Sequence, residues 1–274
     1  MTRSRSQTKQ PRPAALPPFQ ELLDSTDWAS LATARGTGES LPAALALLTS
    51  SDPVIRQSAL QDALGPVTHQ NSIYEATMPV ALYVAAILNH PAVTAGDDSQ
   101  DAKTSPNRPT LVRLLQWLGD TAYDANDECV AMGERLYGEE FLDEYEEMRA
   151  FRDARPAIFS AVHPFLSHPN ADVRHTALVA AIPLIEHPLL TQHQAALASH
   201  ARHLLATSTD RRHRGRVLDA LKAWGHDTSG LEDASDIAAR EHYTLLKAAR
   251  TSREGGYSED PPFWLKAKPF RTIR

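Results

Sequence analysis

Apolar residues recur along much of the chain at intervals of three and four, the spacing of one face of an α-helix. Four stretches show this spacing most clearly: Leu41, Leu45 and Leu48; Leu111, Leu114, Leu115 and Leu118; Ala177, Leu178, Ala181, Ile182 and Ile185; and Val217, Leu221 and Trp224. No alternating Val, Ile or Thr run is flanked by an Asn-Gly or Asp-Gly turn, the pattern typical of a β-hairpin. The chain is therefore predicted to be all-α.

A short pattern recurs at the start of predicted helices: an Asp or Asn, an Arg four residues later, then small and apolar residues at helical spacing. The copies are Asp52 with Arg56, Asn170 with Arg174, Asp210 with Arg214, and Asp236 with Arg240. The first residue suits an N-cap, because its side chain accepts hydrogen bonds from the free amides of the first turn. The arginine can reach back to that cap or to the preceding repeat. The arginines are 118, 40 and 26 residues apart, so the first interval is expected to hold two or three degenerate or interrupted units.

Residues 51–60 and 168–178 resemble the HEAT repeat, a helix pair whose second helix opens with Asp-Pro-x-Val-Arg-x-x-Ala-Leu; residues 231–249 are a weaker third match. The resemblance covers roughly residues 40–250, on the ~40-residue period of such repeats. It implies an α-α superhelix, an armadillo-like solenoid of irregular helix pairs. Bacterial HEAT-like proteins include scaffolds, immunity proteins, bilin lyases and DNA glycosylases, so the resemblance is specific for fold and poor for activity.

Residues 65–79 resemble a His-Gln-x-x-x-Tyr-x-Ala-Thr-x-x-Pro segment of uncharacterised bacterial HEAT-repeat proteins. The matching side chains are His69, Gln70, Tyr74 and Thr77. His69 and Glu75 have the chemistry of an acid–base pair. The alternative, which we favour, is a structural turn between helices, with polar residues capping the next helix and Tyr74 packed between helices.

Charge is distributed unevenly over the 274 residues. The net charge is −6, but residues 120–147 hold eleven acidic residues against Arg135, a local charge of −10. Residues 1–18 form a basic, proline-rich tail that is predicted to be disordered, and residues 251–274 form a second basic tail. Trp264 in that tail suits either a cap over the end of the helical array or a free recognition peptide. The array itself is predicted to span residues 19–250, with a loop insertion at 91–109 and the acidic segment at 120–147.

The acidic segment is the main candidate binding surface. Its carboxylates alternate with apolar residues, so it is either a solvated outer helix or a docking surface that steers a basic protein partner. The candidate partner-binding residues are Glu139, Glu140, Phe141, Asp143, Glu144, Tyr145 and Glu147. Nucleic acid is not favoured as a partner, because the densest folded charge is negative.

Histidine and cysteine give little sign of a metal or a cofactor. Eight of the 12 histidines lie between His163 and His213, without a His-Glu-x-x-His motif, so they are interpreted as solvated or capping residues. The single cysteine, Cys129, cannot form an intramolecular disulfide, which favours a reducing cytoplasm. No apolar run approaches the ~20 residues that span a bilayer. Arginine outnumbers lysine 22 to 6, as GC-rich bacterial codon usage would produce.

Two functional hypotheses follow. The favoured one is a non-enzymatic protein–protein interaction module or scaffold; the resemblance adds an immunity-type inhibitor as its expected role. The alternative is a HEAT-like DNA glycosylase or another enzyme that acts on nucleic acid. The glycosylase would hold a damaged base among Trp, Asp and Arg residues on a concave face. The alternative requires five arginines to converge on one face with Trp224 and an aspartate. These arginines are Arg174, Arg212, Arg214, Arg216 and Arg240. The favoured hypothesis expects these arginines to pack repeat by repeat against capping acids.

Overall fold

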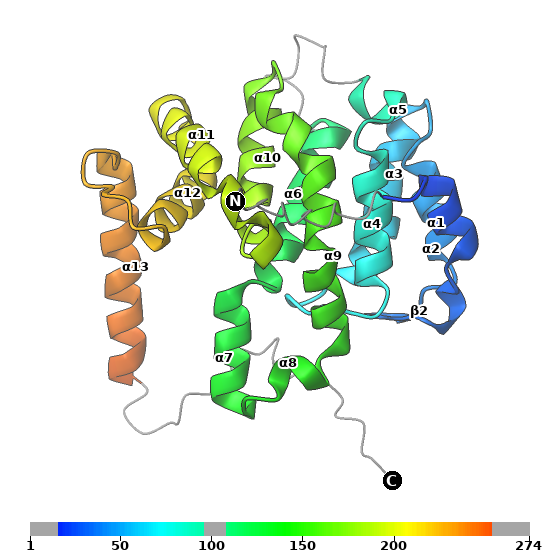
Figure 1. Cartoon of the computed structure of the whole chain (residues 1–274), viewed down its shortest axis with the longest axis horizontal. Coiled ribbons are helices and arrows are strands. Elements are labelled where there is room, and N and C mark those ends of the chain that lie inside the picture. The colour runs from blue at the N-terminus through cyan, green and yellow to red at the C-terminus, as the bar shows by residue number, and fades with distance from the viewer. Residues whose placement is uncertain (1–15, 96–107, 254–274) are drawn as a thin grey trace, which may run out of the picture.

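The computed structural model describes residues 16–95 and 108–253, which are built almost wholly of α-helices (Figure 1). The helices are α1 (Phe19–Ser25), α2 (Leu41–Leu47), α3 (Pro53–Leu64), α4 (Thr77–Ile87), α5 (Pro91–Thr94), α6 (Thr110–Asp124), α7 (Asp127–Tyr137), α8 (Phe141–Glu144), α9 (Glu146–Val162), α10 (Ala171–Leu184), α11 (Gln194–Thr207), α12 (Arg211–Ala223) and α13 (Ala234–Arg253). Short 3-10 turns lie at Trp28–Ser30, Gly65–Val67, His163–Ser167 and Pro188–His193. The all-α prediction is confirmed. In the described ranges the only strands are β1 (Ala32–Thr33) and β2 (Gly36–Thr37), which pair antiparallel over two residues. His69 and Ser72 form one further, isolated bridge.

The helices form four pairs, and the most extensive packing lies between pairs, of α6 with α10 and of α4 with α9. α2 packs against α3, α4 against α6, α9 against α10, and α11 against α12. The second helices of these pairs also contact one another in turn, α3 with α6, α6 with α10, and α10 with α12; we call them the inner row. The long interval between Arg56 and Arg174 holds α4 and α6, which contact each other, and α9, against which α4 packs more extensively. The number of repeat units in this interval stays a prediction. This interval is longer than the other two because it also contains α5, α7 and α8.

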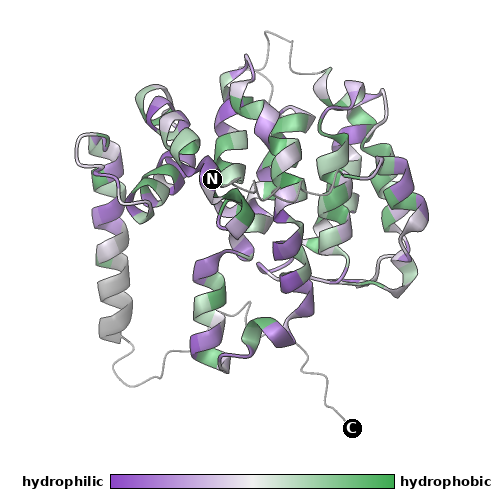
Figure 2. Ribbon diagram, in the orientation of Figure 1, coloured by the Kyte–Doolittle hydropathy of each residue, from purple (hydrophilic) through white to green (hydrophobic). Residues whose placement is uncertain are grey.

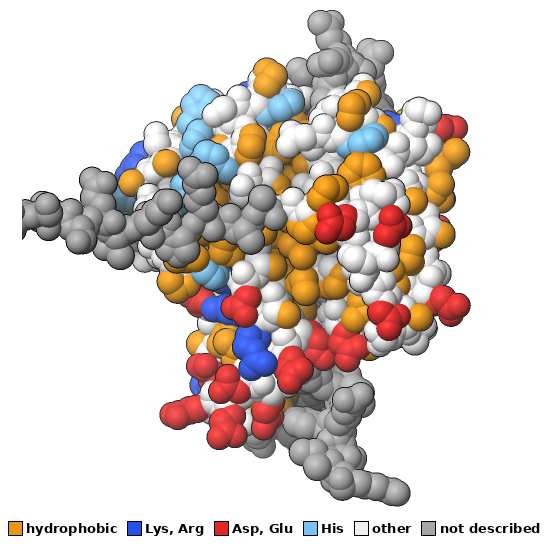
Figure 3. All heavy atoms as spheres, turned by 45° about the vertical axis from the view of Figure 1, so that its right-hand side comes forward, with side chains coloured by type: hydrophobic (Ala, Val, Ile, Leu, Met, Phe, Trp, Pro, Cys, Tyr) orange, Lys and Arg blue, Asp and Glu red, His pale blue; other side chains and the backbone are white. Residues whose placement is uncertain are grey.

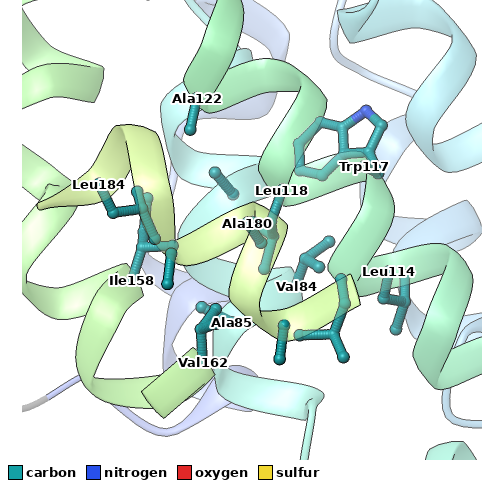
Figure 4. Packing of buried hydrophobic residues seen from close by; sticks show 14 of the residues in the cluster. Val84, Ala85, Leu114, Trp117, Leu118, Ala122, Ile158, Val162, Ala180 and Leu184 are labelled. Atoms are coloured by element: carbon teal, nitrogen blue, oxygen red, sulfur yellow. The ribbon is translucent and has the colours of Figure 1, made fainter. Parts of the chain in front are cut away.

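The core is centred on α10, in which every residue from His175 to Leu184 is buried. Its neighbour α6 approaches closely because Gly119 has no side chain: a Cβ there would lie 3.0 Å from the Cα of Ala180. Figure 4 shows apolar side chains from α4 (Val84, Ala85), α6 (Leu114, Leu118), α9 (Ile158, Val162) and α10 (Ala180, Leu184) meeting in this core. Hydrophobic residues also prevail in α4, whereas α7 carries many hydrophilic ones (Figure 2).

Three copies of the capping pattern share one geometry. Asp52, Asn170 and Asp210 are the N-caps of α3, α10 and α12, and each side chain accepts a backbone N–H of the first turn at 2.8–3.0 Å. The three arginines that follow do not bind their caps. Each instead donates to the carbonyl six residues before it: Arg56 to Ser50 at 2.7 Å, Arg174 to His168 at 2.7 Å and Arg214 to Ser208 at 3.2 Å. The motif therefore fastens the loop that precedes each helix to the helix itself.

The fourth copy departs from this geometry. Asp236 lies inside the first turn of α13, and the carboxylate that receives the first-turn amides, those of Ser235 and Asp236, belongs to Asp233. Asp236 accepts from Arg214 of the preceding helix, with Nε to carboxylate distances of 3.0 and 3.1 Å. Arg240 pairs with Glu232 rather than with a loop carbonyl. Asp233, three residues earlier, occupies the capping position, so the Asp236 carboxylate is available to pair with Arg214.

Parts of the predicted organisation fall outside the described residues. These are most of the two tails, including Trp264, and residues 96–107 of the expected loop insertion. Within the expected loop insertion at residues 91–109, Pro91–Thr94 form the helix α5. Leu16, near the C-terminal end of the tail predicted at residues 1–18, packs against the core. Across the described ranges, no helix combines the length and apolar character required to cross a membrane.

Candidate functional site

The acidic segment forms a projection at one end of the molecule. α7 and α8 extend below the helix pairs in Figure 1, and we call residues 127–147 the acidic projection. Most of its carboxylates are exposed: those of Asp127, Glu128, Glu134, Glu139, Glu140, Asp143, Glu144 and Glu146. Figure 3 shows them gathered as a red cluster at the bottom of the molecule. Glu147, one of the predicted contact residues, is only half-exposed.

Two predicted contact residues of the projection are structural instead. Phe141 and Tyr145 are 8% and 7% exposed, so they do not form the exposed apolar stripe that the sequence pattern predicts. Phe141 lies over Gly133, where a Cβ would come within 2.2 Å of its ring. The Tyr145 hydroxyl donates to the carbonyl of Ile73 at 2.9 Å and accepts the Ile73 N–H at 3.0 Å. The exposed aromatic ring is that of Tyr137, which stacks on Phe141 with ring centroids 5.9 Å apart.

The root of the projection is held by two arginines of α9. Arg152 donates to the carbonyl of Ala125 and to the carboxylate of Asp127, both at 2.6 Å. Arg155, 1% exposed, also donates to Ala125 and lies 3.5 Å from the carboxylate of Glu186. Burial lowers the pKa of Arg155 to about 10 and raises that of Glu186. Because a buried charge is tolerated only when paired, these contacts fix the junction between α6 and α7.

The turn at residues 69–77 connects the projection to the rest of the molecule. Gln70 and Asn71 both adopt left-handed backbone conformations, with φ of 56° and 58°. Thr77 Oγ1 donates to the carbonyl of Val67 at 3.1 Å, and the Tyr74 hydroxyl reaches the carbonyl of His69 at 3.4 Å. Glu75 accepts the N–H of Ala32 at 2.7 Å, and no hydrogen bond joins it to His69 within the described chain. These contacts are those of the structural turn and do not form an acid–base pair.

A second feature is a groove lined by the inner row. It has a volume of about 680 Å³ and is lined by Gln57, Arg108, Arg113, Leu115, Gln116, Gly119, Asp120, Thr176, Val179, Ala180, Asp210, Arg212, His213 and Arg216. The groove continues past Arg113 and Asp120 into a smaller hollow of about 320 Å³ beside Trp117. α3, α6, α10 and α12 all contribute, so the groove exists only because the inner row is assembled.

The carboxylate of Asp120 gathers two arginines of α12 in this groove. Arg212 lies 2.6 Å and Arg216 2.8 Å from the same Asp120 oxygen. The Arg216 guanidinium also covers the ring of Tyr123, 3.9 Å from its centroid, a cation–π arrangement. Nearby, burial raises the pKa of Asp124 to about 7, although Asn71 donates to its carboxylate at 2.8 Å.

The glycosylase hypothesis required five arginines on one face, and the structure separates them. Arg212 and Arg216 meet at Asp120, but Arg174 binds the loop before its own helix and Arg214 is buried against Asp236. Arg240 of α13 pairs with Glu232, which precedes that helix. Trp117, not Trp224, is the tryptophan beside the groove.

The histidines show no arrangement typical of a metal site. Three that precede proline, His90, His168 and His187, each accept a backbone N–H two residues ahead through Nδ1, at 3.2 Å. His193 packs against Phe159 and His163, with ring centroids 4.7 and 5.6 Å away. Across the residues that the structure covers, no cluster of three or more His, Cys, Asp or Glu side chains could hold a metal ion. The Cys129 thiol, whose pKa burial raises to about 11, lies 3.4 Å from the carbonyl of Tyr123.

No protein-family model, curated protein or solved structure matches the chain. The functional proposals therefore rest on the geometry of the acidic projection and of the groove.

Sequence reasoning missed the groove for a physical reason. Arg212 and Asp120 are 92 residues apart, and only the packing of α6 and α10 against α12 brings them together. The run at residues 211–216 gave a partial signal, because it is the one compact basic patch in the predicted folded region. The sequence pattern did not indicate that Tyr137 is exposed, because its exposure depends on the inward orientation of Phe141.

Proposed function

We propose that this protein is a non-enzymatic, cytoplasmic interaction module of the HEAT type that binds a basic protein partner through the acidic projection. An immunity-type inhibitor or a scaffold is the role that fits this activity. The four helix pairs and the shared arginine-to-loop contact support the repeat architecture. A surface of stacked helix pairs suits macromolecules better than small substrates.

The observation that carries the proposal is the contrast between the surface and the interior of the projection. Most of its carboxylates are exposed, while Phe141 packs inside the projection and Tyr145 fixes it to Ile73 in the body of the protein. Arg152 and Arg155 hold its root. The negative charge is therefore presented on a preorganised element, which raises association rates with a basic partner and avoids the cost of ordering the surface on binding.

The contact area combines charge with one aromatic ring. Tyr137 is 38% exposed and lies on the same element as the acidic residues. Tyrosine in a rim of charges is typical of protein–protein contacts, because it offers apolar area and a hydroxyl at low entropic cost. We therefore add Tyr137 to the predicted contact residues and remove Phe141 and Tyr145.

A pair of matched variants tests the proposal. In the first, Glu139→Gln, Glu140→Gln, Asp143→Asn and Glu144→Gln neutralise the projection. In the second, Glu21→Gln, Asp24→Asn, Asp27→Asn and Asp62→Asn neutralise four exposed acids elsewhere, so both variants lose the same charge. Each is used to capture proteins from native lysate at about 50 mM salt, where charge steering is strong, with quantitative mass spectrometry as the readout.

We expect a basic protein that the unmodified chain and the second variant retain and the first variant loses. Its retention should fall as salt rises to about 300 mM, because exposed charges are then screened beyond a few ångströms. Equal capture by both variants, or retention that is insensitive to salt, would contradict the proposal.

A further inference from the structure

The groove of the inner row has the size and charge of a small-ligand site. Its volume of about 680 Å³ lies within the ~300–1,000 Å³ of typical ligand pockets. Four arginines and two aspartates line it, so its formal charge is +2 in a protein whose net charge is −6. This positive groove lies apart from the acidic projection and plays no part in the function proposed above.

Its arginines retain unused hydrogen-bonding capacity. Arg212 and Arg216 each direct one terminal nitrogen to Asp120, which leaves further N–H groups on each of the five-donor guanidinium forks. Arg108 lies 3.6 Å from Asp210 and donates to Gln116 at 3.1 Å. Arg113 pairs with no carboxylate among the described residues, although burial lowers its pKa and so signals partial desolvation.

The buried wall of the groove carries an unpartnered hydroxyl. Thr176 of α10 is 2% exposed, and its Oγ1 has no hydrogen-bond partner in the described chain. A buried hydroxyl without a partner is unfavourable, and helical threonines usually satisfy theirs on the preceding turn. The Oγ1 atom itself is buried, so Thr176 can offer its donor and acceptor to a ligand only when its side chain rotates into the groove.

A helix end borders the groove. α12 has 13 residues, and its N-cap Asp210 and its first-turn residues Arg212 and His213 line the groove. The Asp210 carboxylate already accepts the His213 N–H at 3.0 Å, so the arginines supply the positive charge of the groove. His213 is 9% exposed, and burial lowers its pKa, so its imidazole is neutral at pH 7 and does not add to the charge.

We propose that this groove binds a small organic phosphate, with the phosphate seated among Arg113, Arg212 and Arg216 and Thr176 hydrogen-bonded to the ligand. A charge of +2 matches one phosphate dianion. It is too small for a nucleic-acid backbone, which requires an arginine or lysine for each phosphate it neutralises. Guanidinium forks match phosphate oxygens better than other cations do. The glutamines at positions 57 and 116 supply amide groups for the organic part.

Titration calorimetry on the full chain, with inorganic pyrophosphate and glucose 6-phosphate as probes and glucose as the uncharged control, tests the proposal at about 150 mM salt, which screens weak surface association. We expect saturable binding of one phosphate probe per chain and none of glucose. Arg113→Gln should weaken it about tenfold or more, the effect of losing a hydrogen bond to a charged group. The matched control is Arg211→Gln, because Arg211 is exposed on the same helix end as Arg212 and does not line the groove.

Thr176→Val separates a ligand contact from a structural role. Because the hydroxyl is unpartnered in the free protein, the valine variant should keep or raise the thermal midpoint while binding the phosphate probe several-fold more weakly. A lowered midpoint with unchanged binding would assign the hydroxyl to folding and overturn its ligand role.

Two further outcomes would overturn the proposal. One is the absence of saturable binding, or equal weakening by Arg113→Gln and Arg211→Gln, which would make the phosphate an unspecific counter-ion. The other is tighter binding of a single-stranded oligothymidylate than of either probe, with the same dependence on Arg113, which would assign the groove to nucleic acid.

Discussion

Gly119 of α6 faces Ala180 of α10 so closely that a Cβ on Gly119 would lie 3.0 Å from the Ala180 Cα and 3.1 Å from its Cβ. Both residues also line the groove. This close contact between α6 and α10 therefore also forms part of the wall of the proposed ligand site.

Replacement of Gly119 by valine should destabilise the protein by about 1–3 kcal/mol, since overpacking forces backbone shifts between two buried helices. Gly215→Ala is the matched control. A Cβ at Gly215 meets nothing within 4 Å, so alanine in the middle of α12 should stabilise by about 0.5–1 kcal/mol. Chemical denaturation of both variants measures the two shifts. A Gly119→Val protein as stable as the unmodified chain would show that α6 and α10 do not pack this closely.

Arg214 should be the most sensitive of the repeat arginines. It is 3% exposed and reaches both the loop before α12 and Asp236 of α13. Arg214→Met leaves that carboxylate and the loop carbonyls without a partner, at a cost of about 3–5 kcal/mol. The matched change Arg240→Met breaks a surface pair with Glu232 and should cost less than about 1 kcal/mol. Urea unfolding compares them, and equal effects would remove the distinction between the two arginines.

How far the sequence predicts this fold depends on how each helix begins. α3, α10 and α12 open with a capping side chain, so the start of each carries the recurring pattern in the sequence. α6 begins after Pro109 without any side-chain cap, and α4 is apolar on nearly all faces, so neither helix carries the repeat signature. The pair that they form was therefore hidden from the sequence pattern, although the apolar spacing of α6 was visible.

The charge of the candidate sites could be predicted from the sequence, but their shape could not. The sequence showed the excess of carboxylates at 120–147 directly. It could not show that Phe141 turns onto Gly133, or that Tyr145 reaches Ile73 across 72 residues, because both depend on tertiary packing. Asp120 was counted with the acidic segment, yet it serves the groove.

The carboxyl group of Asp124 should make stability depend on pH. Burial raises its pKa from 3.8 to about 7 in the folded protein. Between about pH 4 and 7 the folded state then binds more protons than the unfolded state, so this group lowers the free energy of unfolding as pH rises through that range. Asp124→Asn removes the titration and keeps an acceptor for Asn71.

The variant should therefore match the unmodified chain near pH 4 and exceed it in stability at pH 8. Thermal melts at both values give the comparison. If the two proteins respond to pH in parallel, the Asp124 carboxyl is not the group that titrates.

Tyr145→Phe tests how the projection is fixed. The change removes two hydrogen bonds to Ile73 and leaves a buried N–H and carbonyl without these partners, so it should cost about 1–3 kcal/mol. Neutralising Glu139, Glu140, Asp143 and Glu144 should change stability by less than about 0.5 kcal/mol, as expected for surface positions. Differential scanning calorimetry measures both. A larger loss from the neutralised variant would mean that these carboxylates serve folding.

The most direct test of binding through the acidic projection is the hydrogen-exchange footprint of the protein with the basic partner that it captures. We expect slower exchange on binding at residues 134–147, with little change in the amides of α6, α10 and α12. Protection confined to those inner-row helices, with the projection unchanged, would contradict it.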